Sequence, residues 1–83
     1  LQKTEDRNLT KYKISYENVL NNKYDSNEIK QKEKEVAVLW NQFQTDPIND
    51  QFISALQSGL NELVDLQNIE DEKQLNLNKV FSL

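Results

Sequence analysis

The sequence predicts an all-α protein: one domain over residues 1–83, built as an antiparallel helical hairpin or bundle of three helices, or four if the last one breaks, and completed by oligomerisation. One glycine and one proline leave too little turn material for a β-sandwich or barrel, which needs a turn every 8 to 12 residues or so. Apolar side chains instead recur every three or four residues, as along one helix face. A chain this short buries only about 60 to 65% of its unfolded surface, so a partner chain is expected.

The first helix is expected over residues 4–22, because its apolar positions lie three or four residues apart. These positions are Leu9, Tyr12, Tyr16, Val19 and Leu20. A polar stretch over residues 21–24 interrupts the pattern. Asp25 then begins an approximate capping box, in which its carboxylate accepts from the first turn of the next helix and Glu28 reaches back.

The second helix is expected over residues 26–44. Its inward-facing side chains are Ile29, Val36, Leu39, Trp40 and Phe43, three of which stand one heptad apart. Lys32 occupies an intervening core-facing position, so its ammonium group is expected to reach out to water. Residues 28–35 interleave three lysines with three glutamates, which is typical of a solvated helix face and not of a phosphate-binding stripe. Direct contact with nucleic acid is therefore not expected.

The third helix is expected over residues 47–81. Pro47 is suited to the first helical position, and Asp46 before it can cap the helix. The apolar ridge over residues 48–66 is the richest in the chain and wide enough to touch two neighbouring helices. Gly59 lies within the ridge and costs about 1 kcal/mol relative to alanine in helix stability. It indicates either a close approach of another helix or a substitution that evolution has tolerated without a packing role.

Beyond Leu66 the apolar pattern thins, and residues 70–72 form an acidic run. A continuous last helix of about 35 residues would be roughly 50 Å long, more than an 83-residue globule comfortably spans. Projection of this helix as one arm of a dimeric bundle is favoured over a break near residues 68–72 followed by a short fourth helix. The C-terminal third is expected to fray or to require a partner.

Missing residue types argue against catalysis. The chain has no cysteine and no histidine, so thiolate nucleophiles, imidazole bases and the usual zinc ligand sets are excluded. We therefore expect no enzyme, no cofactor and no metal site. No apolar run approaches the roughly 18 to 20 residues of a membrane span, so no membrane insertion is expected. The absence of cysteine fits a reducing cytoplasm.

The candidate interface combines the largest apolar side chains of the second helix with the ridge of the third. Its members are Trp40, Phe43, Phe52, Leu56, Gly59, Leu60 and Leu63. The ridge is expected to be too broad for one chain to cover, so a neighbouring molecule, first of all a second copy in a dimer, should cover it. The alternative for Trp40 and Phe43 is an ordinary place in the core.

Residues 12–66 resemble the YlbF/YmcA/YheA family of small helical bacterial regulators. The resemblance lies in the order of the segments YENVLNNKYDSNEI, KQKEKEVAVLW and DPINDQFISALQSGLNELVDL: a helix and polar turn, a charged helix, and an apolar helix after an Asn/Asp-rich break. It implies a cytoplasmic, self-associating, non-catalytic regulator of competence, sporulation and biofilm formation, with a ribonuclease Y regulatory complex as its partner. The cysteines that bind an iron–sulfur cluster in one branch are absent from this sequence, and the family's leading helix is either absent or outside this stretch.

Two other functions remain open at this stage. The first is a coiled-coil fragment of a larger assembly, such as a phage component or a multi-subunit stalk, which would account for the start at Leu1 and the thin C-terminal pattern. The second is a helical bundle of the bacteriocin-immunity type, which would act as a monomer. Two measurements distinguish these functions from a dimeric adaptor: the molecular mass of the chain in solution, and its helicity as a function of protein concentration.

Overall fold

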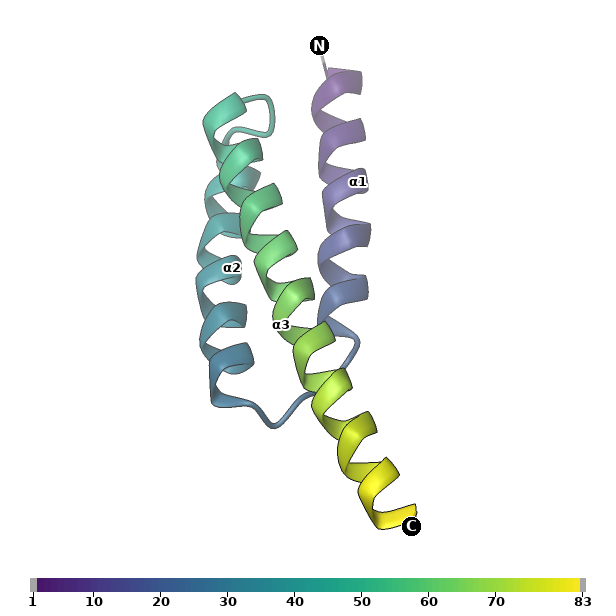
Figure 1. Ribbon diagram of the computed structural model, residues 1–83. Helices are drawn as coiled ribbons and strands as arrows, with labels where there is room; N and C mark the ends of the chain where they lie inside the picture. Colours follow the sequence, from purple (N-terminus) through teal and green to yellow (C-terminus); the bar gives the residue numbers. More distant parts are fainter. Residues whose placement is uncertain (1, 83) are drawn as a thin grey trace.

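The computed structural model describes the backbone of residues 2–82 and the side chains of residues 4–77. Within that range the chain forms three α-helices and no strand: α1 (Gln2–Leu20), α2 (Asn27–Thr45) and α3 (Asp50–Ser82) (Figure 1). The all-α prediction is therefore confirmed. Because α3 runs unbroken for 33 residues, the described chain has no break at residues 68–72 and no separate fourth helix.

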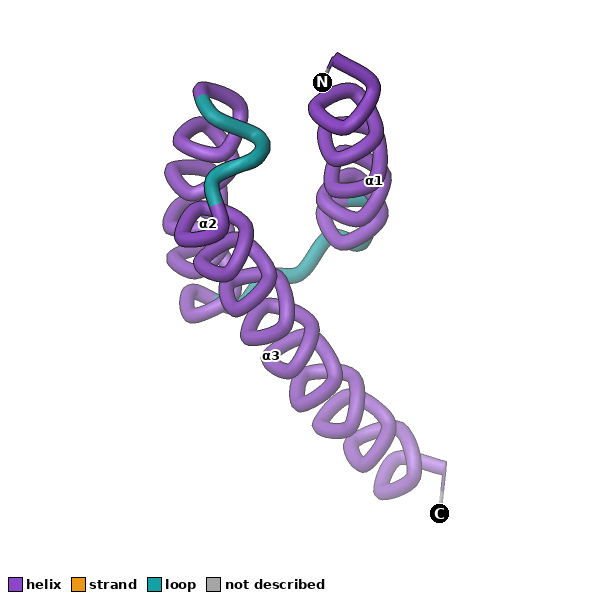
Figure 2. The backbone as a smooth tube through the Cα atoms, turned by 90° about the horizontal axis from the view of Figure 1, so that it is seen from above, coloured by secondary structure: helices purple, strands orange, loops and turns teal. Residues whose placement is uncertain are grey.

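The helices run alternately up and down the long axis, so that neighbours along the chain are antiparallel (Figure 1). α2 and α3 form a closely packed hairpin, and α1 lies against this hairpin with fewer contacts. The molecule measures 59 × 20 × 16 Å, because α3 continues past the ends of α1 and α2 (Figures 1 and 2). The expectation that the last helix projects from the bundle is confirmed.

Ser26, and not Asp25, caps the start of α2. The backbone of Ser26 is extended (φ −77°, ψ 129°), and its hydroxyl accepts a hydrogen bond from the amide of Ile29 at 3.4 Å. This bond satisfies one of the amides that the first turn of a helix leaves without a partner. The cap therefore lies one residue later than predicted, and since Ile29 stands where a capping box needs Glu or Gln, the predicted box does not form. The Asp25 carboxylate lies instead 3.8 Å from the ammonium of Lys30.

The connection between α2 and α3 also differs from the prediction. Asp46 ends α2, its amide donating back into the last turn at 3.1 Å, and Pro47 lies buried in the turn that follows. Asn49 caps α3, since its side-chain oxygen accepts from the amides of Gln51 and Phe52 at 2.9 and 3.4 Å. The prediction of Pro47 as the first helical residue is therefore wrong, because the asparagine after it supplies the cap.

All three helices contribute to the core. The buried apolar side chains are Tyr12 from α1, Ile29, Val36 and Phe43 from α2, and Leu56, Leu60 and Leu63 from α3. The three predicted heptad positions of α2 are thus all buried. Burial of apolar surface is the dominant favourable term in folding, so this core accounts for the association of the three helices within one chain.

The chain's own helices cover the centre of the apolar ridge over residues 48–66. Leu56 and Leu63 are fully buried, whereas Ile48 and Val64 at the margins are exposed. The centre of the ridge is thus covered within the chain, because both α1 and α2 contribute side chains to the core around it, whereas its margins stay accessible to a second molecule.

Gly59 marks a close approach of α3 to α2. A Cβ atom at this position would lie 2.8 Å from Leu39 Cδ1 and 3.3 Å from Val36 Cγ2. Carbon atoms pack best at about 3.5 to 4.0 Å, so an added methyl group meets neighbours that must move. Of the two sequence interpretations of Gly59, close helix approach is confirmed.

Candidate functional site

The seven candidate interface residues divide between the core and the surface. Phe43, Leu56, Gly59, Leu60 and Leu63 are buried within the chain, whereas Trp40 and Phe52 are partly exposed. A partner can therefore reach Trp40 and Phe52 on the closed bundle, but it can reach the other five only if the helices separate. The structure places Phe43 in the ordinary core, which was the alternative interpretation, and leaves Trp40 at its edge.

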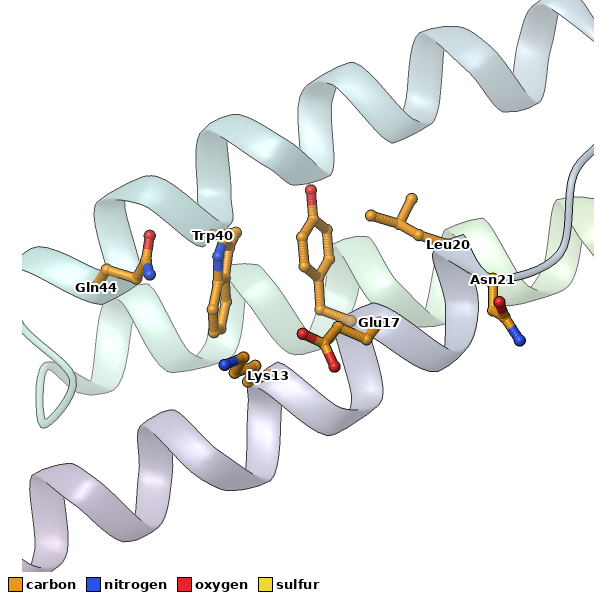
Figure 3. A pocket seen from close by; sticks show the side chains of 7 residues that line it. Lys13, Glu17, Leu20, Asn21, Trp40 and Gln44 are labelled. Atoms are coloured by element: carbon orange, nitrogen blue, oxygen red, sulfur yellow. The ribbon is translucent and has the colours of Figure 1, made fainter.

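Trp40 lies in a groove between α1 and α2 (Figure 3). The groove has a volume of about 390 Å³, and Lys13 and Glu17 of α1 border it opposite Trp40. The Tyr16 and Trp40 rings stack, with 5.3 Å between their centroids and 19° between their planes. Since Trp40 is also 5.5 Å from the ring of Phe43, this aromatic pair connects the groove to the core.

A second groove, of about 620 Å³, runs along the other side of α1, where α1 faces α3. Within it, Gln57 Nε2 donates a hydrogen bond to the Tyr12 hydroxyl at 2.5 Å. At the end of α1, the buried Gln67 donates from Nε2 to the carbonyl of Val19 at 2.9 Å, which satisfies one of the carbonyls that a helix end leaves unpaired. Open grooves therefore flank α1 on both sides.

The third surface is the α3 arm, by which we mean residues 68–82, the end of α3 that begins beside the first turn of α2 and continues past the bundle (Figure 1). Its side chains Ile69, Leu75 and Leu77 are 50%, 56% and 50% exposed. Tyr24, in the loop between α1 and α2, donates its hydroxyl to Asp71 Oδ1 at 3.0 Å and so holds the first turn of the arm. From residue 72 to residue 77 every side chain is exposed.

The candidate residues chosen from the sequence omit these three apolar side chains of the arm. Apolar residues on a helix are ordinarily core residues, and the thinning pattern after Leu66 gave them little weight. The signal for them in the sequence was that the third predicted helix is longer than either of the two before it. Towards the end of a helix that is longer than its neighbours, an apolar residue has less intramolecular surface to pack on.

Lys32 forms an ion-pair cluster that joins α2 to α3. Its Nζ lies 2.7 Å from Glu62 Oε2 and 2.9 Å from Glu35 Oε2. The hydrogen bonds to Glu62 and then to Glu35 raise the pKa of Lys32 above its ordinary value of 10.5. The prediction that this lysine turns its charged group out of the core is confirmed, since the side chain reaches the carboxylates at the surface.

Two tyrosines also titrate at higher pH than usual. Burial, and then the Glu33 carboxylate, raise the pKa of Tyr16 above its ordinary value of 10.0. For Tyr24 the pKa is raised by desolvation first and then by its hydrogen bond to Asp71. Both hydroxyls therefore hold their protons more tightly in the folded chain than in the unfolded one.

We expect the free energy of unfolding to fall as the pH rises above about 10, because the unfolded chain then releases protons that folded Tyr16, Tyr24 and Lys32 retain. The stabilisation that these raised pKa values provide is fully present at pH values below the pKa of the groups in the unfolded chain. It is lost as the pH rises through their pKa in the folded chain. Urea denaturation between about pH 8 and about pH 11 measures the decline. Tyr16→Phe keeps the stacked ring without the hydroxyl and should make the decline shallower; a decline of unchanged slope would contradict the assignment of Tyr16.

The described residues offer no evident site for a metal ion or a small polar ligand. They contain no group of three or more side chains of the metal-binding types. Every buried side-chain nitrogen or oxygen in this part of the chain has a hydrogen-bond partner, so no unpaired polar group points into a groove. No helix within residues 2–82 combines the length and the apolar character that crossing a membrane requires.

The chain matches no protein-family model, no curated protein and no solved structure. Three surfaces are relevant: the Trp40 groove, the groove between α1 and α3, and the α3 arm. All three present apolar or aromatic side chains beside polar or charged ones.

Proposed function

We propose that this chain is a non-enzymatic regulatory or adaptor protein that forms a dimer and binds a protein partner through its helices. The α3 arm carries the proposal: it presents three half-exposed apolar side chains on a helix that extends past its own bundle. Covering these side chains with another helix removes their apolar surface from water, which is favourable.

The amino-acid composition favours binding over catalysis. With no histidine and no cysteine in the chain, the ionisable groups left for chemistry are carboxylates, amines and phenols. A catalytic carboxylic acid needs a desolvated pocket that raises its pKa towards neutrality. The carboxylates with described contacts instead pair with lysines or accept hydrogen bonds from tyrosine and amide side chains.

A more specific proposal follows from the resemblance of residues 12–66 to the YlbF/YmcA/YheA family. On that basis the chain acts in the bacterial cytoplasm as a regulator of competence, sporulation or biofilm formation, and its protein partner is a ribonuclease Y regulatory complex. The helical hairpin and the uncovered arm support this proposal, because a self-associating helical regulator needs a surface of this kind.

The arm also favours a second function, a coiled-coil component of a larger assembly. In an assembly component, a flanking or partner helix would supply most of the missing contacts. Helicity measured by circular dichroism on dilution separates the two functions. An adaptor with its own core keeps its helicity in α1 and α2 at low concentration, whereas an assembly fragment loses it.

We expect the double substitution Ile69→Glu and Leu77→Glu to weaken dimerisation by about tenfold or more, equivalent to about 1.4 kcal/mol. The new carboxylates would be buried in the interface next to the acidic residues 70–72, where desolvation and like charge both oppose association. Sedimentation equilibrium at micromolar concentration measures the change. Since both positions are half-exposed in the single chain, its fold should be retained.

The matched control is Ile14→Glu with Val38→Glu, two exposed apolar positions on α1 and α2. This pair adds the same charge away from the arm and should leave the dimer intact. A wild-type mass equal to one chain would contradict the proposed function. A control that dissociates the dimer as strongly as the arm variant would show that the arm is not the surface involved.

A further inference from the structure

We propose that α1 is an exchangeable helix: it detaches from the α2–α3 hairpin, and in the dimer the α1 of each chain occupies the position that the α1 of the other has left. The inference rests on the self-association proposed above and identifies the element that passes between the chains. Three features support it: α1 is weakly anchored, a second α1 would match the site that the first one leaves, and the loop between α1 and α2 can act as a hinge.

α1 is the helix least deeply anchored in the core. Among the described side chains it contributes one buried residue, Tyr12, whereas α2 and α3 contribute three apolar residues each. The close packing is between α2 and α3, and α1 makes far fewer contacts with either of them. Because the free energy of local opening follows the apolar contacts that opening breaks, α1 separates at a lower cost than the hairpin does.

Grooves lie along both sides of α1, so the margins of its contact with α2 and α3 are open to solvent. Their volumes are about 390 and 620 Å³. Three separate hydrogen bonds hold α1 along its length. Asn8 Nδ2 donates to the Pro47 carbonyl at 2.9 Å, Gln57 donates to the Tyr12 hydroxyl, and Gln67 donates to the Val19 carbonyl. Water replaces the partner in each bond when α1 opens, so these bonds set its register without fastening it permanently.

The occupant that fits the site that α1 leaves on α2 and α3 is the α1 of a second copy. The edge of the Tyr12 ring meets Phe43 at 5.3 Å, and Tyr16 stacks on Trp40 at the same distance. A second α1 carries the same side chains in the same order, so exchange recreates each contact between chains. Exchange of an identical element between protomers is a low-cost route to a dimer.

The hinge lies at the end of the molecule from which the arm projects (Figure 1). α1 joins α2 through residues 21–26, a loop that spans up to about 20 Å when extended. Tyr24 in this loop bonds to Asp71 in the arm, so hinge and arm are in direct contact. A two-fold axis at this end therefore brings the two hinges and the two arms together in one interface.

A photo-cross-linking experiment on the full-length chain tests the exchange. Lys13 is exposed and borders the groove opposite Trp40, so p-benzoyl-L-phenylalanine placed there reports which α2 lies beside α1 (Figure 3). Equal amounts of unlabelled and ¹⁵N-labelled chains are mixed, allowed to exchange and irradiated, and the dimer fraction is digested. Mass spectrometry then identifies cross-links to the α2 peptide that contains Trp40. If α1 exchanges, about half of these cross-links join unlike isotopes.

The control places the same amino acid at Glu62, an exposed residue of α3 that contacts Lys32 of α2. Its cross-links to α2 should join like isotopes only, because the hairpin stays within one chain. Dimers whose Lys13-position cross-links join like isotopes only would overturn the exchange and leave self-association standing. Unlike isotopes at the Glu62 position would also overturn it, since more than α1 would then be exchanged. A chain that remains monomeric overturns both proposals.

Discussion

Replacing Phe43 with alanine is expected to lower the free energy of unfolding by about 3 to 5 kcal/mol, the range for truncating a buried phenylalanine. Phe43 is fully buried, and its ring lies 5.3 Å from that of Tyr12 and 5.5 Å from that of Trp40. The substitution removes both aromatic contacts and leaves a cavity between α1 and α2. Small domains are stable by only about 5 to 15 kcal/mol, so the loss is a large share of the total.

Urea denaturation followed by the fluorescence of Trp40, the single tryptophan of the chain, measures this loss next to the site of the change. Val38→Ala is the matched control, because Val38 lies on the same helix and is 56% exposed. We expect it to change stability by no more than about 0.5 kcal/mol. If Phe43→Ala kept the stability of the chain and weakened only its association, Phe43 would be an interface residue and its place in the core would be contradicted.

Replacing Gly59 with leucine is expected to cost about 1 to 3 kcal/mol or more, the usual result of forcing extra carbon atoms into a packed contact. The Cβ alone would lie 2.8 Å from Leu39 Cδ1 and 3.3 Å from Val36 Cγ2, and Val36 is fully buried. The remaining carbons of leucine would then push α2 and α3 apart. Leucine is nearly as good a helix former as alanine, so the loss reports packing and not helix propensity.

Two further variants separate packing from helix propensity. Gly59→Ala gains about 1 kcal/mol in propensity, which offsets the shift of the Leu39 methyl group, so we expect a net change of less than about 1 kcal/mol. Ser58→Leu places the same side chain on the exposed neighbouring position and should be nearly neutral. Thermal or urea unfolding compares the three. A Gly59→Leu chain as stable as Ser58→Leu would show that α2 and α3 have room at this point.

The periodic part of the fold could be predicted because it depends on neighbours along one helix. The heptad of Ile29, Val36 and Phe43 is buried as expected, and Lys32 turns its ammonium outward between them. The caps were less predictable. Asp25 and Ser26 can both cap a helix, and so can Asp46 and Asn49. The choice between adjacent candidates depends on the path of the loop, which local sequence does not reveal.

The candidate interface was the least predictable feature. An apolar stripe has the same sequence pattern whether it packs against the same chain or another one. For Leu56 and Leu63 the partner is the chain itself, whereas Ile69 and Leu77, on the arm, are each 50% exposed. A search for the widest stripe therefore selects the core, and the exposed apolar surface is found only after the helices are placed side by side.

By itself the sequence determined that the chain is helical and which face of each helix is apolar, because helix periodicity and scarcity of turn residues are local properties. The tertiary structure alone decided which apolar residues are covered. α1 and α2 have 19 residues each and α3 has 33, so two short helices cover the first part of a long one and leave its end exposed. Coverage depends on the relative lengths and positions of packed helices, and these come into being only when the chain folds.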